Sequence, residues 1–500
     1  MNLWRFVYRC PYDRGAFVPG GVRVNPPLTL GAHFMKLCTH AGLRAAAVAV
    51  MCAAVPTHAD TPTDDAELRT KLDAAMTKIA QMDAKISSLE AQNDETWLTQ
   101  ERAAEIKGLV QDVLADADTR ASLMQSGMTS GYDDGFILSS ADGNWLLKTN
   151  FLMQQRFIFN HQNDFEAPNV DSTRYGFENT RSTFMMQGYA FSPEWFYRID
   201  VNLGSNGGGV VPQDPRVGTL DAYLGYDFGM GLKFFMGSAK LPFLREELVE
   251  SQNQQLVERS IVNYGFTLGY SDGLQMEYEL DYFRFYGAFS NGFYGAEQPF
   301  NQPGPFGNAE YAFTGRIEWK PAGNWQEFQQ FTSPRGEEFG ILVGGAAHYE
   351  RQEYGTLAGP EAEYFFLTGD ISAQFGGANL FAYIVWNEIK DSPLGEDFHP
   401  WGFSVQAGYY VEETWEIFAR YEWADSDTAF GDDELSVVTI GFNKYFRGQN
   451  SKWTVDLGYG LQPVVGAGQF NGLAPITEWR QDVGTNDGQF VIRTQWQLLF

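Results

Sequence analysis

From residue 145 to the end of the chain, apolar and polar side chains alternate with a period of two in one segment after another. In the last segment Phe490, Ile492, Trp496, Leu498 and Phe500 fall on one side and polar residues on the other. Successive side chains of a β-strand point to opposite faces of its sheet. Each segment is therefore predicted to be a strand with one apolar and one polar face.

The apolar side of these strands carries almost no charge, and Trp or Tyr stands at its ends, as Trp415 and Trp423 do. A soluble sandwich buries its apolar face in protein, whereas a transmembrane barrel turns that face to lipid between aromatic girdles. No run of eighteen apolar residues follows position 60, which excludes a helical membrane protein. We therefore predict an all-β fold, a transmembrane antiparallel β-barrel preceded by a short helical segment.

The number of predicted strands is about sixteen. An even number lets both chain ends lie on the periplasmic side, and sixteen strands leave an aqueous lumen. The expected ranges are 145–160, 179–192, 195–204, 217–228, 232–240, 265–278, 281–290, 309–320, 338–351, 361–375, 378–389, 399–411, 414–424, 434–447, 450–462 and 487–500.

The first 59 residues are predicted to be a leader. Residues 35–59 have the charged, apolar and small-x-small regions of a signal peptide, and residues 1–34 precede what we take to be the true start. All three cysteines lie in this leader, so the chain from Asp60 has no disulfide, thiolate metal site or cysteine nucleophile. A lipoprotein anchored at Cys52 is disfavoured because the preceding Met51 is too large.

The chain from Asp60 is strongly acidic. The leader holds six of the 35 basic and one of the 63 acidic residues, which leaves 29 basic and 62 acidic. A nucleic-acid partner is excluded because phosphate binding needs clustered positive charge. The acid excess indicates solvated extracellular loops or a preference for cations in the pore, and net charge alone does not separate the two.

Residues 60–134 are predicted to be a periplasmic helical segment and linker. Their apolar positions follow heptad spacing, which predicts a short coiled coil or, alternatively, a single amphipathic helix. A second helix is expected over 97–124 and a flexible joint over 127–135, with the barrel from 135 onward. The heptad positions are Leu68, Leu72, Ala75, Ile79, Met82, Ile86 and Leu89.

Three stretches resemble the phosphate-selective porin O and P family of sixteen-stranded outer-membrane porins. They are GSAKLPFLREE (237–247) followed by Glu258-Arg259-Ser260, RSTFMMQGYAFSPEWFYRIDVNLG (181–204), and the aromatic last strand ending in Phe500. The resemblance covers about 135–500. It implies a homotrimeric, general or anion-preferring porin, inserted by the outer-membrane assembly machinery that reads the C-terminal aromatic residue.

The chain departs from the family in its basic residues. Phosphate selectivity in the family is attributed to a ladder of arginines and a ring of lysines, and no such basic run appears here. Phosphate specificity is therefore not carried over. The N-terminal heptads are an addition that the best-known members lack.

The alternation of side chains along each strand places a set of charged residues on the side that faces the lumen. These residues either set the electric field felt by passing ions or neutralise one another in pairs, an interpretation we favour and which would also involve Asp456. The predicted pore-lining residues are Lys148, Arg156, Arg181, Arg198, Asp200, Asp221, Arg316, Glu318, Glu416, Arg420, Glu422 and Arg493.

The longest interior connection, 241–264, follows the fifth strand. Folded inward it would narrow the channel with opposed charges, and otherwise it would be an exposed extracellular loop. The stiff Pro242-Phe243 entry favours constriction. Its candidate residues are Lys240, Arg245, Glu246, Glu247, Glu258 and Arg259.

Two further motifs have weaker interpretations. Gly269 to Gly273 matches G-x-S-x-G, but a nucleophile elbow needs a strand, a turn and a helix, and this match lies in a β pattern. An acidic run around Asp425 to Glu434 is either a solvated loop or a bridge, through divalent cations, to lipopolysaccharide; it lacks the spacing of a calcium loop.

The sequence thus predicts an outer-membrane porin that lets small hydrophilic solutes diffuse, with no catalysis, no metal and no cofactor. Its expected surroundings are outer-membrane lipid and lipopolysaccharide. One alternative is a barrel that anchors a structural tether to the cell wall through the N-terminal helices. A second is an outer-membrane hydrolase using Ser271.

Overall fold

The computed structural model describes two compact units, one of which contains every described residue from 128 onward and the other the helical residues near position 80. The described residues are 73–74, 76–85, 87–88, 128–163, 171–204, 218–296, 309–352, 361–391, 397–427, 433–464, 476–480 and 487–500. The predicted leader 1–59 and the second predicted helix, 97–124, lie outside them.

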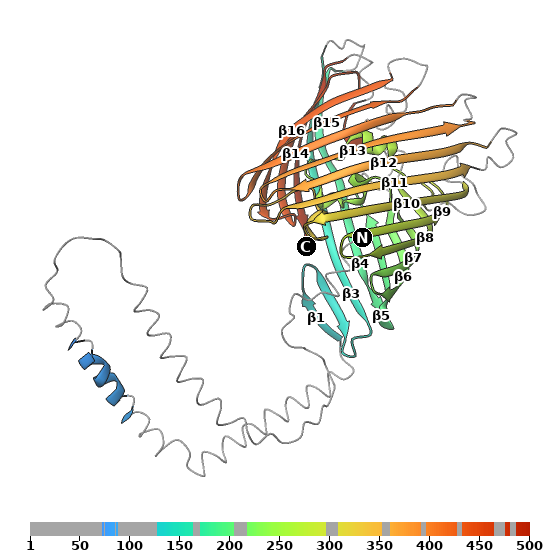
Figure 1. The fold of residues 1–500 in the computed structure, drawn as a ribbon. Helices are drawn as coiled ribbons and strands as arrows, with labels where there is room; N and C mark the ends of the chain where they lie inside the picture. Colours follow the sequence, from blue (N-terminus) through green and yellow to red (C-terminus); the bar gives the residue numbers. More distant parts are fainter. Residues whose placement is uncertain are drawn as a thin grey trace. The chain divides into compact units, whose positions relative to one another are not determined.

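A closed antiparallel sheet of sixteen strands forms the wall of the larger unit. Each strand pairs with the next along the chain (Figure 1), and the last pairs with the first, with Ile492 opposite Phe159 and Leu499 opposite Leu152. The strands are β3 (Leu146–Gln162), β4 (Thr173–Ala190), β5 (Ser192–Asn202), β6 (Gly218–Gly229), β7 (Leu232–Lys240), β8 (Tyr270–Glu279), β9 (Phe283–Ser290), β10 (Ala309–Ala322), β11 (Gly340–Gln352), β12 (Glu363–Gln374), β13 (Ala378–Lys390), β14 (Trp401–Glu412), β15 (Trp415–Asp425), β16 (Glu434–Arg447), β17 (Ser451–Gly460) and β18 (Gln489–Leu499). The predicted fold class and strand number are confirmed.

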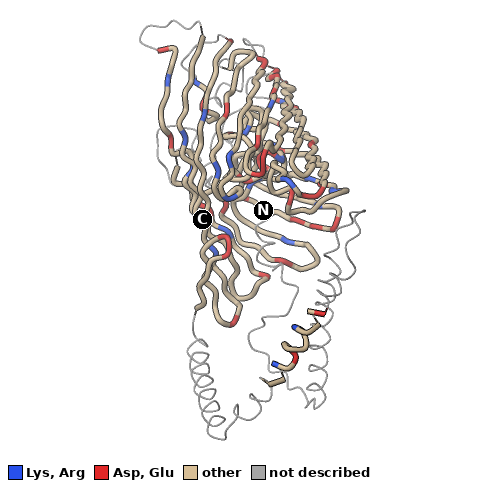
Figure 2. Tube along the Cα trace, turned by 90° about the vertical axis from the view of Figure 1, so that its left-hand side faces the viewer, with Lys and Arg blue, Asp and Glu red and all other residues tan. Residues whose placement is uncertain are grey.

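The alternation that predicted the strands also sets their two faces. On β10, Ile317 and Trp319 are 54% and 47% exposed on the outer face, whereas Arg316 and Glu318 are buried inside. Basic and acidic residues are interspersed along the strands rather than gathered in a block of one sign (Figure 2). The outer face is therefore apolar and the charged residues of this strand turn inward.

Two predicted strand boundaries are wrong by several residues. The second strand begins at Thr173 rather than 179, because an extra residue, Thr180, forms a β-bulge that reverses the alternation partway along β4. The sixth strand begins at Tyr270 rather than 265. Helix α6 occupies the earlier residues, and Gly269, with a φ of +64°, turns the chain from that helix into β8.

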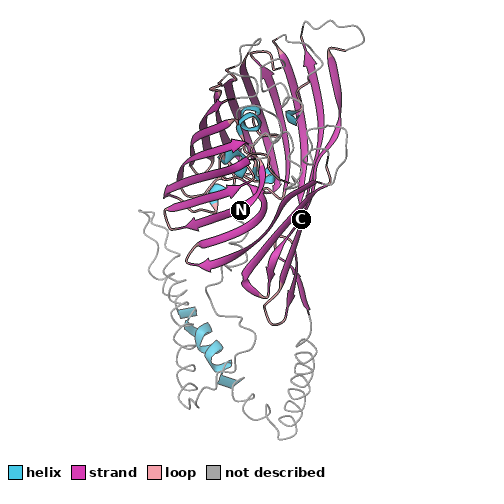
Figure 3. Ribbon diagram, turned by 90° about the vertical axis from the view of Figure 1, so that its right-hand side faces the viewer, coloured by secondary structure: helices cyan, strands magenta, loops and turns pink. Residues whose placement is uncertain are grey.

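The two ends of the barrel differ in what closes them. We call the end where β3 begins and β18 ends the terminal mouth, and the opposite end the distal mouth. The long connection 241–269 starts at the distal mouth and folds inside the wall. It contains α5 (Arg245–Leu248), η1 (Ser251–Asn253) and α6 (Ile261–Phe266), and these short helices lie within the curve of the sheet (Figure 3). We call this connection the inner loop.

Apolar side chains of the inner loop pack against apolar residues of the inner wall. Phe243 lies 6.3 Å from Phe366, measured between ring centroids, and both are buried with Phe381 and Val437 in one cluster. The sequence analysis expected hydrophilic residues on the inner face, and at these wall positions that expectation is wrong. The inner loop replaces water there, so apolar side chains become favourable.

A second connection also folds inward, at the terminal mouth. Residues 323–339 join β10 to β11 and contain η2 (Glu327–Gln329). The Trp325 indole nitrogen donates to the Leu280 carbonyl at 3.0 Å, and Phe328 is buried. We call this segment the inner turn.

The wall is extended at the terminal mouth by a hairpin of β1 (Met128–Tyr132) and β2 (Phe136–Ser140). Strand β2 pairs with β3 over 146–149, the part of its edge that the last strand does not reach, since the C-terminal residue pairs with Phe151. The sequence analysis assigned most of this hairpin to a flexible joint, and that assignment is wrong. The free edge of β3 next to the hairpin gives β2 a strand to pair with.

The smaller unit is described only at its helical residues between 73 and 88. Of the predicted heptad positions, Ile79 and Met82 are helical and are 43% and 57% exposed. The other five lie outside the described residues, so the coiled coil stays a prediction. Within the described residues, no helix is both long enough and apolar enough to cross a membrane.

Candidate channel interior

The six arginines predicted to line the lumen lie on the inner wall, and each has a carboxylate within 4 Å. The ion pairs are Arg156 with Glu258 (2.8 Å) and Glu478, Arg181 with Glu258 (2.8 Å), Arg198 with Asp200 (2.6 Å), Asp221 (3.3 Å) and Glu250 (2.9 Å), Arg316 with Glu318 (3.0 Å) and Asp370 (2.7 Å), Arg420 with Glu246 and Glu422 (both 3.4 Å), and Arg493 with Asp456 (2.7 Å) and Glu478 (3.4 Å).

Several of these carboxylates come from the inner loop rather than from the wall. Glu246, Glu250 and Glu258 each reach a wall arginine. The alternation of a strand reveals which wall residues face inward, but it does not show which residues of a loop will meet them. The pairing of wall with loop was therefore absent from the sequence analysis.

Glu416 differs from the other predicted acids because neutral groups surround it. Its carboxylate accepts hydrogen bonds from Gln255 at 2.7 Å, Asn379 at 3.0 Å, Asn443 at 2.9 Å and the Tyr445 hydroxyl at 2.6 Å. Gln255 belongs to the inner loop and the other three to the wall. Glu416 thus gathers loop and wall around one acceptor.

Glu258 is the most heavily bonded acid of the inner loop. Its Oε1 accepts from Arg181 and from the Tyr264 hydroxyl, both at 2.8 Å, and from the backbone N–H of Arg259 at 3.0 Å. Burial raises the pKa of Glu258, but Arg181 and Arg156 outweigh burial and hold that pKa well below its ordinary value. The carboxylate therefore stays charged and ties the loop to two wall arginines.

The remaining predicted loop residues bind within the loop or to neighbouring segments. Arg259 donates to the backbone carbonyls of Glu246 and Val249 at 3.1 and 2.9 Å, and it lies 3.3 Å from the Glu247 carboxylate. Lys240 lies 3.3 Å from the Glu250 carboxylate. Much of the charge on the loop is thus compensated inside the loop.

Arg245 connects the inner loop to both the wall and the inner turn. Its Nε donates to the Ser372 hydroxyl at 2.9 Å, and its Nη2 donates to the Phe328 carbonyl. Its guanidinium also lies 5.9 Å from the ring centroid of Phe331. The two inward-folded segments therefore meet inside the barrel.

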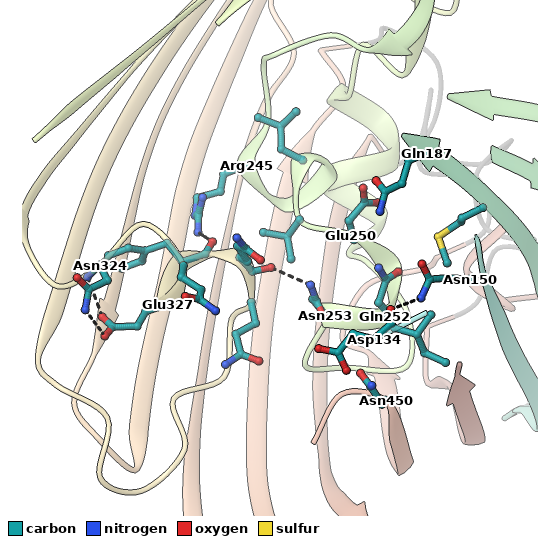
Figure 4. A pocket seen from close by; sticks show the side chains of 18 of the residues that line it. Asp134, Asn150, Gln187, Arg245, Glu250, Gln252, Asn253, Asn324, Glu327 and Asn450 are labelled. Carbon is teal, nitrogen blue, oxygen red and sulfur yellow. Dashed lines mark hydrogen bonds between the residues drawn. The ribbon is translucent and has the colours of Figure 1, made fainter. Parts of the chain in front are cut away.

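A cavity of about 500 Å³ remains between these two segments and the wall near the terminal mouth (Figure 4). The predicted residues Lys148, Arg198, Arg245 and Glu318 line it. Glu337 of the inner turn lines it as well. Partial burial and the neighbouring carboxylate of Glu327 raise the pKa of Glu337 to about 7, against a hydrogen bond with Ser333.

Sequence analysis missed several charged residues of the interior. Arg284 on β9 and Asp370 on β12 are buried inside, and the strand alternation was sufficient to place both. The alternation of β17 likewise places Lys452 inside, where it donates to the Gln254 carbonyl at 2.6 Å. Glu478 belongs to a connection that folds inward, for which no local sequence signal exists.

The G-x-S-x-G match lies at the start of strand β8. Ser271 is in the strand, with Ala239 opposite it on β7, rather than on the strand–turn–helix elbow of a hydrolase. The ring nitrogens of His348 contact Thr314 at 2.9 Å and Glu350 at 3.2 Å, not this serine. The geometry of Ser271 therefore does not support the hydrolase alternative.

Comparison with known proteins agrees with this architecture. The family model of the phosphate-selective porin O and P family matches residues 143–335, a region that runs from β3 through the inner loop to the inner turn. Over this region the chain is similar to the porin O and P family. The resemblance expected from the sequence is confirmed there, and the match includes the stretches 181–204 and 237–247 that suggested it.

One curated protein that the chain is similar to is an uncharacterised protein of Aquifex aeolicus. It is 24% identical over 264 residues, which are 48% of this chain and 62% of the relative. The chain thus matches about three fifths of that relative's length.

The solved structures that the chain is similar to include three outer-membrane proteins. An anion-selective porin from Comamonas acidovorans has a TM-score of 0.48 at 10% identity, over 71% of this chain and 99% of that one. OmpT of Vibrio cholerae has 0.45 at 12%, over 71% and 98%. The channel DcaP of Acinetobacter baumannii has 0.44 at 10%, over 71% and 98%. The assignment rests on the family match and on the closed barrel itself.

Proposed function

We propose that this protein is an outer-membrane porin through which small hydrophilic solutes diffuse passively. The observation that carries the proposal is the closed sixteen-stranded sheet with an apolar outer face and a charged, hydrogen-bonded interior. Lipid satisfies the outer face, and a closed barrel leaves no unpaired strand edge in the membrane. The porin O and P family match supports the same conclusion.

The inner loop and the inner turn act as the filter of this channel. Both reduce the space inside the wall, and Arg245 joins them. The charges of the inner loop are largely paired, with wall residues or within the loop, so the filter selects mainly by size and hydrogen bonding, with only weak preference for the sign of an ion. The predicted pore-lining and loop residues thus determine the width and hydrogen-bonding groups of the interior more than its net charge.

In this proposal the terminal mouth faces the periplasm, and the even number of strands places both chain ends on that same side. The hairpin β1–β2 and the N-terminal segment then extend into the periplasm. Phe500 is 39% exposed beside Phe151, where the outer-membrane assembly machinery would recognise it. The porin assembles as a homotrimer among outer-membrane lipid and lipopolysaccharide, by analogy with its family.

Conductance across a planar bilayer tests the channel. The chain from Asp60 contains no cysteine, so a single cysteine can be placed at will. We expect a positively charged thiol reagent to reduce the current of Asn150→Cys, which lines the cavity, and to leave Ile317→Cys, on the lipid face, unaffected. The reversal potential in a salt gradient measures the ion preference, which we expect to be weak.

The structural tether makes the opposite prediction. A barrel that serves only as an anchor for the N-terminal helices gives no stepwise conductance in any salt. A current that the reagent reduces equally in both cysteine variants would also contradict the proposal, because it would not pass through the interior of the barrel.

A further inference from the structure

The cavity between the inner loop and the inner turn has a lining that is suited to a particular class of solute. Residues from β3, β4, β5, β9 and β10 form its wall side. Its volume of about 500 Å³ lies within the range of pockets that enclose small organic molecules, about 300–1,000 Å³. It is therefore large enough to hold a solute on its way through the channel.

Amide side chains are as numerous in the lining as charged ones. Nine of the lining residues are Asn or Gln, and Figure 4 shows Asn150, Gln187, Gln252, Asn253 and Asn450 around the cavity. Each amide offers both a donor and an acceptor and carries no net charge. Such a lining can bind hydroxyl groups, which also donate and accept.

The lining has four basic and five acidic residues, and each of its three arginines lies within 4 Å of a lining carboxylate. Arg198 lies 2.9 Å from the Glu250 carboxylate, and Arg245 and Arg284 lie 3.7 and 3.6 Å from that of Glu318. An anionic solute would have to compete with these carboxylates, and a cation would meet the arginines. The cavity therefore gives no strong advantage to either sign.

One amide of the lining has a buried acceptor that is not used. Gln187 is 4% exposed, and its Oε1 has no hydrogen-bond partner within the described residues. Leaving a buried acceptor unpaired costs more than the mean hydrogen bond contributes. If the Gln187 amide turns toward the cavity, a donor carried by a solute would satisfy this oxygen, and Tyr286 and Phe328 supply apolar surface for the solute's carbon skeleton.

We propose that this cavity is a binding subsite for uncharged solutes that carry several hydroxyl groups, such as sugars and polyols. The inference deepens the proposed porin function and rests on it. It names the solute class as neutral, whereas the family name refers to phosphate. A site whose polar groups are arranged for hydroxyls discriminates strongly against solutes that leave those groups unpaired.

Single-channel recording with sucrose tests the subsite. We expect sucrose to interrupt the current of the wild-type channel in a saturable way, and sodium phosphate and lysine hydrochloride, at matched ionic strength, to cause no saturable block. Gln187→Leu removes one hydrogen bond and should weaken the sucrose block by about fivefold. Gln187→Met is the alternative if the leucine variant does not fold.

Gln406→Leu is the matched control. Gln406 is also an inward-facing, buried glutamine with an unpaired Oε1, but it does not line the cavity. Its replacement should leave the sucrose block unchanged. Equal weakening in both variants would overturn the assignment of the subsite to this cavity.

The outcomes separate the subsite from the channel. A channel that conducts but is blocked by phosphate as strongly as by sucrose, or is not blocked by sucrose at all, overturns the subsite and leaves the porin intact. Titration calorimetry of the detergent-solubilised full chain with sucrose needs no current. A protein that binds sucrose there, with the same dependence on Gln187, but does not conduct overturns the porin and supports the subsite.

Discussion

The docking of the inner loop inside the barrel depends on the charge of Glu258. This side chain and those of Arg156 and Arg181 are 1%, 0% and 12% exposed, with 2.8 Å between the carboxylate and each guanidinium. Glu258→Gln keeps the shape and the acceptor oxygen but removes the charge. Breaking a buried ion pair costs about 3–5 kcal/mol.

The expected cost lies at the lower end of that range. Arg156 keeps its contacts with Glu478 and Gln495, and Arg181 keeps its hydrogen bond to Gln154. A loss of about 3 kcal/mol in docking free energy raises the undocked fraction of the loop on the order of 100-fold. The loop backbone at Arg259, which is buried in the docked state, would then become accessible to trypsin.

Limited trypsin digestion in detergent, read by mass spectrometry, measures this fraction. When the loop opens and closes faster than it is cut, the cleavage rate after Arg259 follows the undocked population. Glu279→Gln is the control, since it removes an ion pair with Arg284 between two wall strands. If cleavage after Arg259 is unchanged in Glu258→Gln, or rises equally in both variants, the ion pairs of Glu258 do not hold the loop.

Two further predictions concern the inner turn and the lipid face. As the pH falls through about 7, Glu337 takes up a proton and the cavity loses a negative charge. The ratio of cation to anion permeability should therefore fall, and Glu337→Gln should remove this change from the profile of reversal potential against pH. A wild-type profile that does not change with pH would contradict the assignment of this titration to Glu337. Ile317→Arg, on the outer face of β10, should lower the free energy of unfolding in lipid vesicles by about 2–4 kcal/mol, measured by urea titration. The control Ile317→Val should change that free energy little. If the arginine variant is as stable as the wild type, this face does not meet lipid.

The sequence by itself determined the wall. All sixteen strands follow from the alternation of apolar and polar residues, because successive residues of a strand face two different environments. The largest error in the wall is the predicted start of β4, which is too late in the sequence. It arose at the bulge of Thr180, where the alternation of apolar and polar residues shifts by one position.

The interior was decided by the tertiary structure. Phe366 and Phe381 face inward against the expected pattern because the inner loop covers them, and Glu258 reaches Arg156 and Arg181 across long stretches of chain. Strand alternation is a local property that reports on which side of the sheet a residue lies. The contacts inside the barrel depend on how the inner loop and the inner turn fold back into it. The alternation of residues along a strand contains no information on the course of these two segments.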